Sequence, residues 1–131
     1  MANTFHVSVI TPERAVLEAE ATFAALPAHD GELGILKGRA AMLYRLGAGL
    51  LRIDTAEGKR ALFVAGGFAQ MLDDRLTILT ETAKEPDKLD RAAAERALAE
   101  AEAMKSTSDP EFKARQRALA SARAQLRLAP R

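Results

Sequence analysis

The composition of this chain changes abruptly near residue 83. All eight glycines lie at or before Gly67, and every valine and isoleucine lies at or before Ile78. The remainder is rich in alanine and in charged residues that favour helices. Strand-formers with turn residues, followed by helix-formers without them, are typical of two successive parts rather than of one interleaved α/β fold. We therefore expect a β domain at residues 1–83 and a helical appendage at residues 84–131.

The first part has the pattern of an antiparallel β sandwich or barrel. Phe5, Val7 and Val9 alternate with more polar positions, as in a strand with one face in a core. Short apolar runs follow, separated by Pro27, by glycines or by the pair Asp73-Asp74 at intervals of ~8–12 residues. The pair Gly66-Gly67 lacks the spacing of a phosphate-binding loop, and it predicts a bulge or a close backbone approach between two strands.

The second part reads as two antiparallel helices. Asp87 is expected to cap a first helix beginning at Pro86-Asp87, and Asp109 to cap a second helix with Pro110 at its first position. The expected apolar stripes are Leu89, Ala93, Ala97, Ala101 and Met104 on the first helix, and Phe112, Leu119 and Leu126 on the second. Because much of the stripe is alanine, which buries little apolar area, we expect a hairpin that is weakly docked and able to move.

Charge is distributed unevenly. Residues 1–83 carry 8 basic and 10 acidic side chains, net −2, and residues 84–131 carry 11 basic and 8 acidic, net +3. From Pro110 onward the only acidic residue is Glu111, and the basic residues are Lys113, Arg115, Arg117, Arg123, Arg127 and Arg131. Arg123 and Arg127 share one helix face, where their repulsion is relieved by an anionic partner. An acidic protein, nucleotide phosphates, nucleic acid, an anionic membrane and plain solvent all remain open.

Catalytic chemistry finds little support in the residues. There is no cysteine, and His6 and His29 are the only histidines, in a strand and in a turn, so no triad or metal-binding spacing can be assembled. No apolar stretch approaches the ~20 residues that span a bilayer. We expect a non-enzymatic protein without a metal or other cofactor.

Particular motifs add a family resemblance that covers essentially the whole chain. These are Val9-Ile10-Thr11-Pro12-Glu13, the run Asp30-Gly31-Glu32-Leu33-Gly34-Ile35-Leu36, then Gly66-Gly67-Phe68, Leu76-Thr77-Ile78-Leu79, and Ala122-Arg123-Ala124-Gln125-Leu126-Arg127-Leu128. With these motifs the chain resembles the epsilon subunit of bacterial rotary ATP synthases. The Gly-Glu-Leu-Gly-Ile run is the most specific of them.

The resemblance implies a central-stalk role in proton-driven ATP synthesis. In the family the sandwich binds the gamma subunit and the ring of c subunits, and the mobile hairpin restrains ATP hydrolysis by meeting an acidic segment of the beta subunit. Carried over to this sequence, Gly31 and Glu32 would face the c ring, and Arg123 and Arg127 would meet the acidic partner. The resemblance also implies a peripheral position on the cytoplasmic face of a bacterial inner membrane, with membrane contact only through the complex.

Some relatives bind ATP on the folded hairpin through an Ile/Leu-Asp-x-x-Arg-Ala motif. The corresponding stretch here begins with Leu89-Asp90, but Ala93 stands where the motif has arginine. A weak nucleotide site would use Asp90, Arg123 and Arg127, and no cofactor is expected.

A different class of function is a small β domain that binds nucleic acid through its basic helical tail. No aromatic residues interleave the basic ones to stack on bases, which disfavours this alternative.

Overall fold

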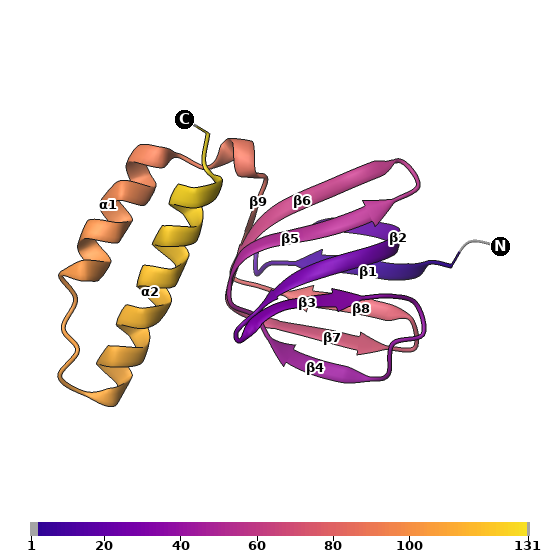
Figure 1. Ribbon diagram of the computed structural model, residues 1–131, viewed down its shortest axis with the longest axis horizontal. Helices are drawn as coiled ribbons and strands as arrows, with labels where there is room; N and C mark the ends of the chain where they lie inside the picture. The colour runs from indigo at the N-terminus through magenta and orange to yellow at the C-terminus, as the bar shows by residue number, and fades with distance from the viewer. Residues whose placement is uncertain (1–2, 131) are drawn as a thin grey trace.

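The computed structural model describes residues 3–130, so Arg131 of the basic tail lies outside the described residues. Nine strands form a β sandwich, and two helices lie against one end of it (Figure 1). The strands are β1 (Phe5–Ile10), β2 (Ala15–Ala28), β3 (Gly31–Ile35), β4 (Met42–Arg45), β5 (Ala48–Thr55), β6 (Gly58–Ala65), β7 (Phe68–Leu72), β8 (Arg75–Leu79) and β9 (Thr82–Lys84). A short 3-10 helix, η1 (Pro86–Lys88), leads into α1 (Arg91–Glu102) and α2 (Asp109–Leu128). The two-part fold expected from the composition is confirmed.

The strands follow the hydrogen-bonded order β4-β7-β8-β1-β2-β5-β6-β9, with β3 added beside β2. Each pairing is antiparallel except that of β1 with β8, which is parallel. An all-antiparallel sandwich was expected, and this pair is the exception. A parallel pair needs a long crossover between its strands, which here is the whole chain from β2 to β7.

Strand β2 is longer than the sequence suggests. It passes through Pro27, which was expected to end a strand, and it pairs first with β1 and then with β3 and β5. Its register shifts between Ala21 and Phe23 as it changes partners. Proline is tolerated because it lacks only the N–H donor, and Pro27 still offers its carbonyl, which accepts from the Gly47 N–H at 2.7 Å.

The sandwich core is built by the inward-facing, alternating residues of the strands. Strand β1 alternates buried and half-buried positions along its length, as its sequence predicts. The largest side chains without solvent exposure include Phe5, Leu26, Ile35, Leu51, Ile53, Met71, Leu76 and Ile78. This core draws on strands β1 to β8 and on neither helix.

The helical hairpin is confirmed, but its boundaries and stripe differ from expectation. Asp87 lies in η1, and Asp90 caps α1 by accepting from the Ala92 N–H at 3.0 Å. Ser108, rather than Asp109, caps α2 by accepting from the Glu111 N–H at 3.2 Å. With α1 starting five residues later than Pro86, its buried positions become Ala94 and Ala101. Met104 and Phe112, expected in the stripes, are 38% and 50% exposed, while Leu119 is buried as predicted.

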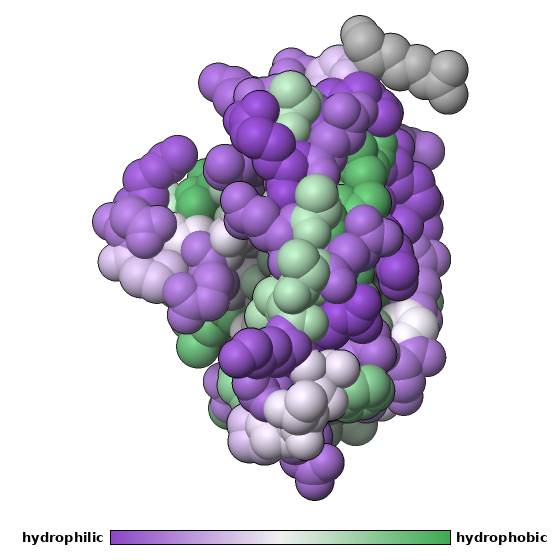
Figure 2. All heavy atoms as spheres, turned by 90° about the vertical axis from the view of Figure 1, so that its left-hand side faces the viewer, coloured by the Kyte–Doolittle hydropathy of each residue, from purple (hydrophilic) through white to green (hydrophobic). Residues whose placement is uncertain are grey.

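In this structure the hairpin is folded against the sandwich. Helix α2 packs on β5, β6 and η1, and it separates α1 from the sheets (Figure 1). A second apolar cluster forms at this junction, from Phe63, Leu89, Ala124 and Ala129 with Ala48, Ala65 and Leu128 at its edge. The helical side of the molecule is mostly hydrophilic, with a narrow strip of weakly hydrophobic residues (Figure 2).

Candidate functional site

Gly31 and Glu32, the residues predicted to face the c ring, are the first two residues of strand β3, directly after the turn that joins it to β2. Both are exposed. The Glu32 carboxylate accepts a hydrogen bond from the Arg52 guanidinium at 3.2 Å, and both side chains remain at least half exposed. Exposed ion pairs of this kind are weak and exchange readily for a partner. The turn is therefore available to another surface.

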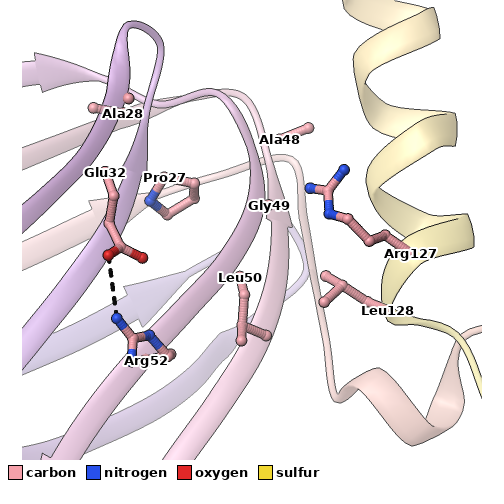
Figure 3. Close-up of a pocket in the computed structure, with 10 residues that line it drawn as sticks. Pro27, Ala28, Glu32, Ala48, Gly49, Leu50, Arg52, Arg127 and Leu128 are labelled. Carbon is pink, nitrogen blue, oxygen red and sulfur yellow. Dashed lines mark hydrogen bonds and ion pairs between the residues drawn. The ribbon is translucent and has the colours of Figure 1, made fainter.

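A hollow of about 330 Å³ joins this turn to the end of α2 (Figure 3). One wall carries Gly31, Glu32 and Arg52, and the facing wall carries Arg127 and Leu128. Two sites predicted independently, the c-ring contact and one of the paired arginines, thus meet across a single hollow. Because Arg127 reaches this position from α2, the hollow is complete only while the hairpin is folded down.

Arg123 lies apart from this hollow. It is exposed on α2, beside the buried Ala122 and Ala124, and lines neither of the two hollows described for this structure. Asp90, the third residue of the predicted nucleotide site, is occupied as the cap of α1 and lines neither hollow. Asp90, Arg123 and Arg127 are therefore not gathered around one cavity here, and a nucleotide role for them stays a prediction.

A larger hollow opens between the first half of α2 and the end of the sandwich. Its volume is about 750 Å³, and its lining includes Arg45, Lys113, Arg117 and His29 against Glu81. Phe112 lies at this hollow and is half exposed. The sequence analysis did not single out this hollow, although the spacing of Lys113 and Arg117 places both on one helix face.

The outer face of β4, β7 and β8 exposes an apolar surface that the sequence analysis also missed. Leu43, Phe68, Leu72 and Leu79 are between 48% and 68% exposed. Phe68 pairs directly with Leu79, and Leu43 pairs with Gln70, so period-2 alternation places all four side chains on the same face. Contiguous exposed apolar residues mark protein–protein contact surfaces. An alternating strand pattern shows that a strand has two different faces. It does not show which face packs in the core and which face contacts a partner.

His6 lies on β1 between two glutamates of the neighbouring strand. Its Nδ1 lies 3.0 Å from Glu20 and its Nε2 lies 3.3 Å from Glu18, both on the neighbouring strand β2. The hydrogen bond with Glu20, followed by that with Glu18, raises the pKa of His6. This cluster lies on the strand surface and lines neither hollow.

Within residues 3–130, no group of three His, Asp or Glu side chains is placed to hold a metal ion. No helix in the same range is both long and apolar enough to cross a membrane.

The fold and its exposed surfaces are those of a subunit that contacts other proteins. A β sandwich with an apolar outer face is joined to a docked helical hairpin whose second helix is basic. A family model described as the ATP synthase Delta/Epsilon chain, beta-sandwich domain, matches residues 4–86. The chain therefore belongs to the ATP synthase epsilon chain family, whose members are non-catalytic subunits of that complex.

Curated relatives agree over most of the chain. The ATP synthase epsilon chain of Rhodopirellula baltica is 48% identical over 119 residues, covering 91% of this chain and 93% of the relative. That of a Synechococcus strain is 42% identical over 106 residues, covering 80% of this chain and 77% of the relative. Membership of this family does not favour the nucleic-acid alternative.

Solved structures share the fold. A chain of the Euglena gracilis mitochondrial ATP synthase, in a structure of OSCP, F1 and c-ring, superposes with a TM-score of 0.77 at 22% identity, covering 93% of this chain and 79% of that one. A chain of the Tetrahymena thermophila central stalk and c-ring superposes with a TM-score of 0.62 at 16% identity, covering 94% and 91%.

Proposed function

We propose that this chain forms the foot of the ATP synthase rotor, where the sandwich joins the gamma subunit to the c ring and the hairpin restrains ATP hydrolysis. On this reading the protein couples proton flow to ATP synthesis and lies peripherally on the cytoplasmic face of a bacterial inner membrane. The observation that carries the proposal is the apolar outer face of β4, β7 and β8, because an apolar surface of this kind is costly to leave in water without a permanent partner.

We assign this apolar face to the gamma subunit and the turn at Gly31 and Glu32 to the c ring. The apolar face suits a permanent contact, which gains from apolar burial. The turn carries a charged, exposed side chain, which suits a contact with a polar loop. The two surfaces come from different strands, so one sandwich can bind both partners at once.

Association with gamma tests this assignment. Phe68→Glu and Leu79→Glu place charges on the apolar face at exposed positions, so the fold should persist. Each should abolish co-elution of the chain with its cognate gamma subunit. Thr22→Glu, at an exposed position on β2, is the matched control and should still co-elute. Undiminished co-elution of both apolar-face variants would remove the assigned contact, and failure of the unaltered chain to co-elute would remove the proposed function.

We assign the restraint on ATP hydrolysis to Arg123 and Arg127, which are exposed on α2. An acidic segment of the beta subunit would engage them when the hairpin extends. Replacing both with alanine should raise ATP hydrolysis by the assembled complex and leave assembly intact. The double variant Lys113→Ala with Arg117→Ala removes the same charge from the same helix and serves as control. Equal hydrolysis in the two double variants would show that net charge, rather than this pair, sets the rate.

A further inference from the structure

Arg91 occupies a position where a positive charge is unfavourable. It is the first residue of α1, and the amino end of a helix carries partial positive charge. The first turn of α1 contains no acidic residue that would offset it. Nothing within α1 itself therefore explains an arginine at this position.

The explanation lies across the hairpin. The Arg91 Nη2 donates to the carbonyl oxygen of Leu126 at 2.8 Å and to that of Ala129 at 3.4 Å. These carbonyls belong to the last turn of α2 and the residue that caps it, where helix carbonyls lack intrahelical partners and the dipole is negative. The guanidinium thus joins the beginning of α1 to the end of α2.

The same place is where the hairpin meets the sandwich. Leu89 is buried with Ala124, Ala129 and Phe63 of β6 in the second apolar cluster. Arg91 follows Leu89 by two residues, so its guanidinium lies where three elements converge. Moving the end of α2 away would break the two hydrogen bonds and open the cluster together.

We infer that Arg91 is an internal latch: it holds the end of α2 against the beginning of α1, beside the junction with the sandwich, so that α2 cannot leave its folded position without breaking these two hydrogen bonds. In the folded position the charge of Arg91 is accepted by the carbonyls of α2. When α2 separates from α1, the same charge loses these carbonyls and lies in solvent at the unfavourable amino end of its own helix, with only the capping carboxylate of Asp90 beside it. The side chain therefore favours one conformation over the other, which is the requirement for shifting a conformational equilibrium. The inference rests on the proposed mobility of the hairpin but not on its effect on hydrolysis.

Hydrogen–deuterium exchange on the isolated full chain tests the latch. Arg91→Ala should speed exchange of the α2 amides between residues 122 and 129 by about tenfold or more, since hydrogen bonds from a charged donor are lost. Arg91→Lys keeps the charge but not the planar guanidinium geometry, so its exchange rate should lie between that of the unaltered chain and that of Arg91→Ala. Arg96→Ala removes an exposed arginine from the same helix and should leave these amides unchanged.

A distance measurement gives an independent readout. The chain has no cysteine, so spin labels can be attached at Glu57→Cys and Ala120→Cys, two exposed positions on the sandwich and on α2. The inter-label distance distribution should be narrow with Arg91 and gain a longer component in Arg91→Ala.

Three results would overturn the inference. Exchange and distances in Arg91→Ala could match those of Arg96→Ala, in which case Arg91 does not hold the hairpin. Exchange could also rise equally in β1 and β2, which would make Arg91 a residue of general stability. Exchange could finally rise in Arg91→Ala while the inter-label distances stay unchanged, which would mean that α2 does not leave the sandwich when the contact is lost. None of these depends on gamma binding or hydrolysis, so the proposed function can fail or stand separately.

Discussion

Gly67 is the residue whose identity the fold constrains most visibly. Its φ is +102°, and a Cβ placed on it would overlap the carbonyl oxygen of Leu79. Its own carbonyl accepts from the Leu46 N–H at 2.8 Å, so the backbone cannot shift freely. The close backbone approach predicted from the Gly66-Gly67 pair is thus present at the second glycine.

Gly67→Ala should therefore lower the free energy of unfolding by about 3 kcal/mol or more, because backbone strain and steric overlap add. Gly66→Ala is the control, since Gly66 also has a positive φ, +73°, but open space around the missing Cβ. It should cost only about 1 kcal/mol. Urea denaturation of both variants measures the difference, and equal costs would contradict the steric argument.

His6 gives the sandwich a pH dependence whose sign follows from its partners. Glu20 and Glu18 raise the pKa of His6 in the folded chain above its usual value of 6.5. A raised pKa means that the stabilisation is fully present below the unfolded pKa and is lost as pH rises through the folded pKa. Since these groups are on the surface, the effect should be about 0.2–1 kcal/mol.

The predicted pH dependence can be measured by denaturing the unaltered chain and His6→Gln at several pH values. The stability difference should be largest below pH 6.5 and shrink as the pH rises above the folded pKa of His6. The double variant Glu18→Gln with Glu20→Gln should lose the same dependence. A difference that grows toward alkaline pH would contradict the assigned sign.

At the scale of elements, docking of α2 depends on small side chains at its end. Ala124 is 1% exposed and packs in the same cluster as Phe63 of β6. The weak docking expected from the alanine content stays a prediction, and this junction, where small side chains lie between helix and sheet, is the place to test it.

Ala124→Leu should push α2 from the sandwich, because an extra side chain in a filled contact costs about 1–3 kcal/mol. Amides of α2 should exchange faster while those of β1 and β2 stay protected. Ala99→Leu, at an exposed position of α1 that lines neither hollow, should change neither. Unchanged exchange in Ala124→Leu would mean that the junction can accommodate a larger side chain, although Ala124 is buried there.

Elements with a periodic pattern could be predicted from the sequence. Elements that depend on a neighbouring strand or on a capping residue could not. Strand β1 and both helices have clear periodicity. Strand β3 is rich in glycine and has an exposed glutamate, and it forms a strand because β2 offers it a hydrogen-bonding edge. Helix α1 begins after η1 rather than at Asp87 because Asp90, directly before the alanine run, supplies the capping carboxylate.

For the whole molecule, the residues that fill the sandwich core all lie between Phe5 and Ile78. The predicted division into residues 1–83 and 84–131 has not been tested and stays a prediction. Strand β9 continues one residue past it, to Lys84. A truncation after Lys84 keeps the main core complete and uncovers only the second cluster around Phe63.

The truncated chain should fold, keep a β-type circular dichroism spectrum and unfold cooperatively, with a Tm lower by several degrees because Phe63 becomes exposed. Thermal scans of full and truncated chains provide the comparison. An unfolded truncation would show that the hairpin belongs to the folding unit rather than forming an appendage.

Sites were harder to predict than the fold. The sequence indicated the turn at Glu32 and the arginine pair, but the hollow that brings Glu32 and Arg127 together depends on how the hairpin is folded. The exposed face around Phe68 reads in sequence like core, since apolar residues alternate in the same way on either face of a strand.

The parallel pairing of β1 with β8 also fixes an order of events during synthesis. The first strand emerges from the ribosome early, yet its partner on that side follows only after β2 to β7 have been made. Until then one edge of β1 stays open, and such edges invite pairing with other chains. Contacts between distant segments form slowly. A nascent chain is therefore most exposed to aggregation in the period before β1 pairs with β8. The helices are translated last and meet a sandwich that can already be closed.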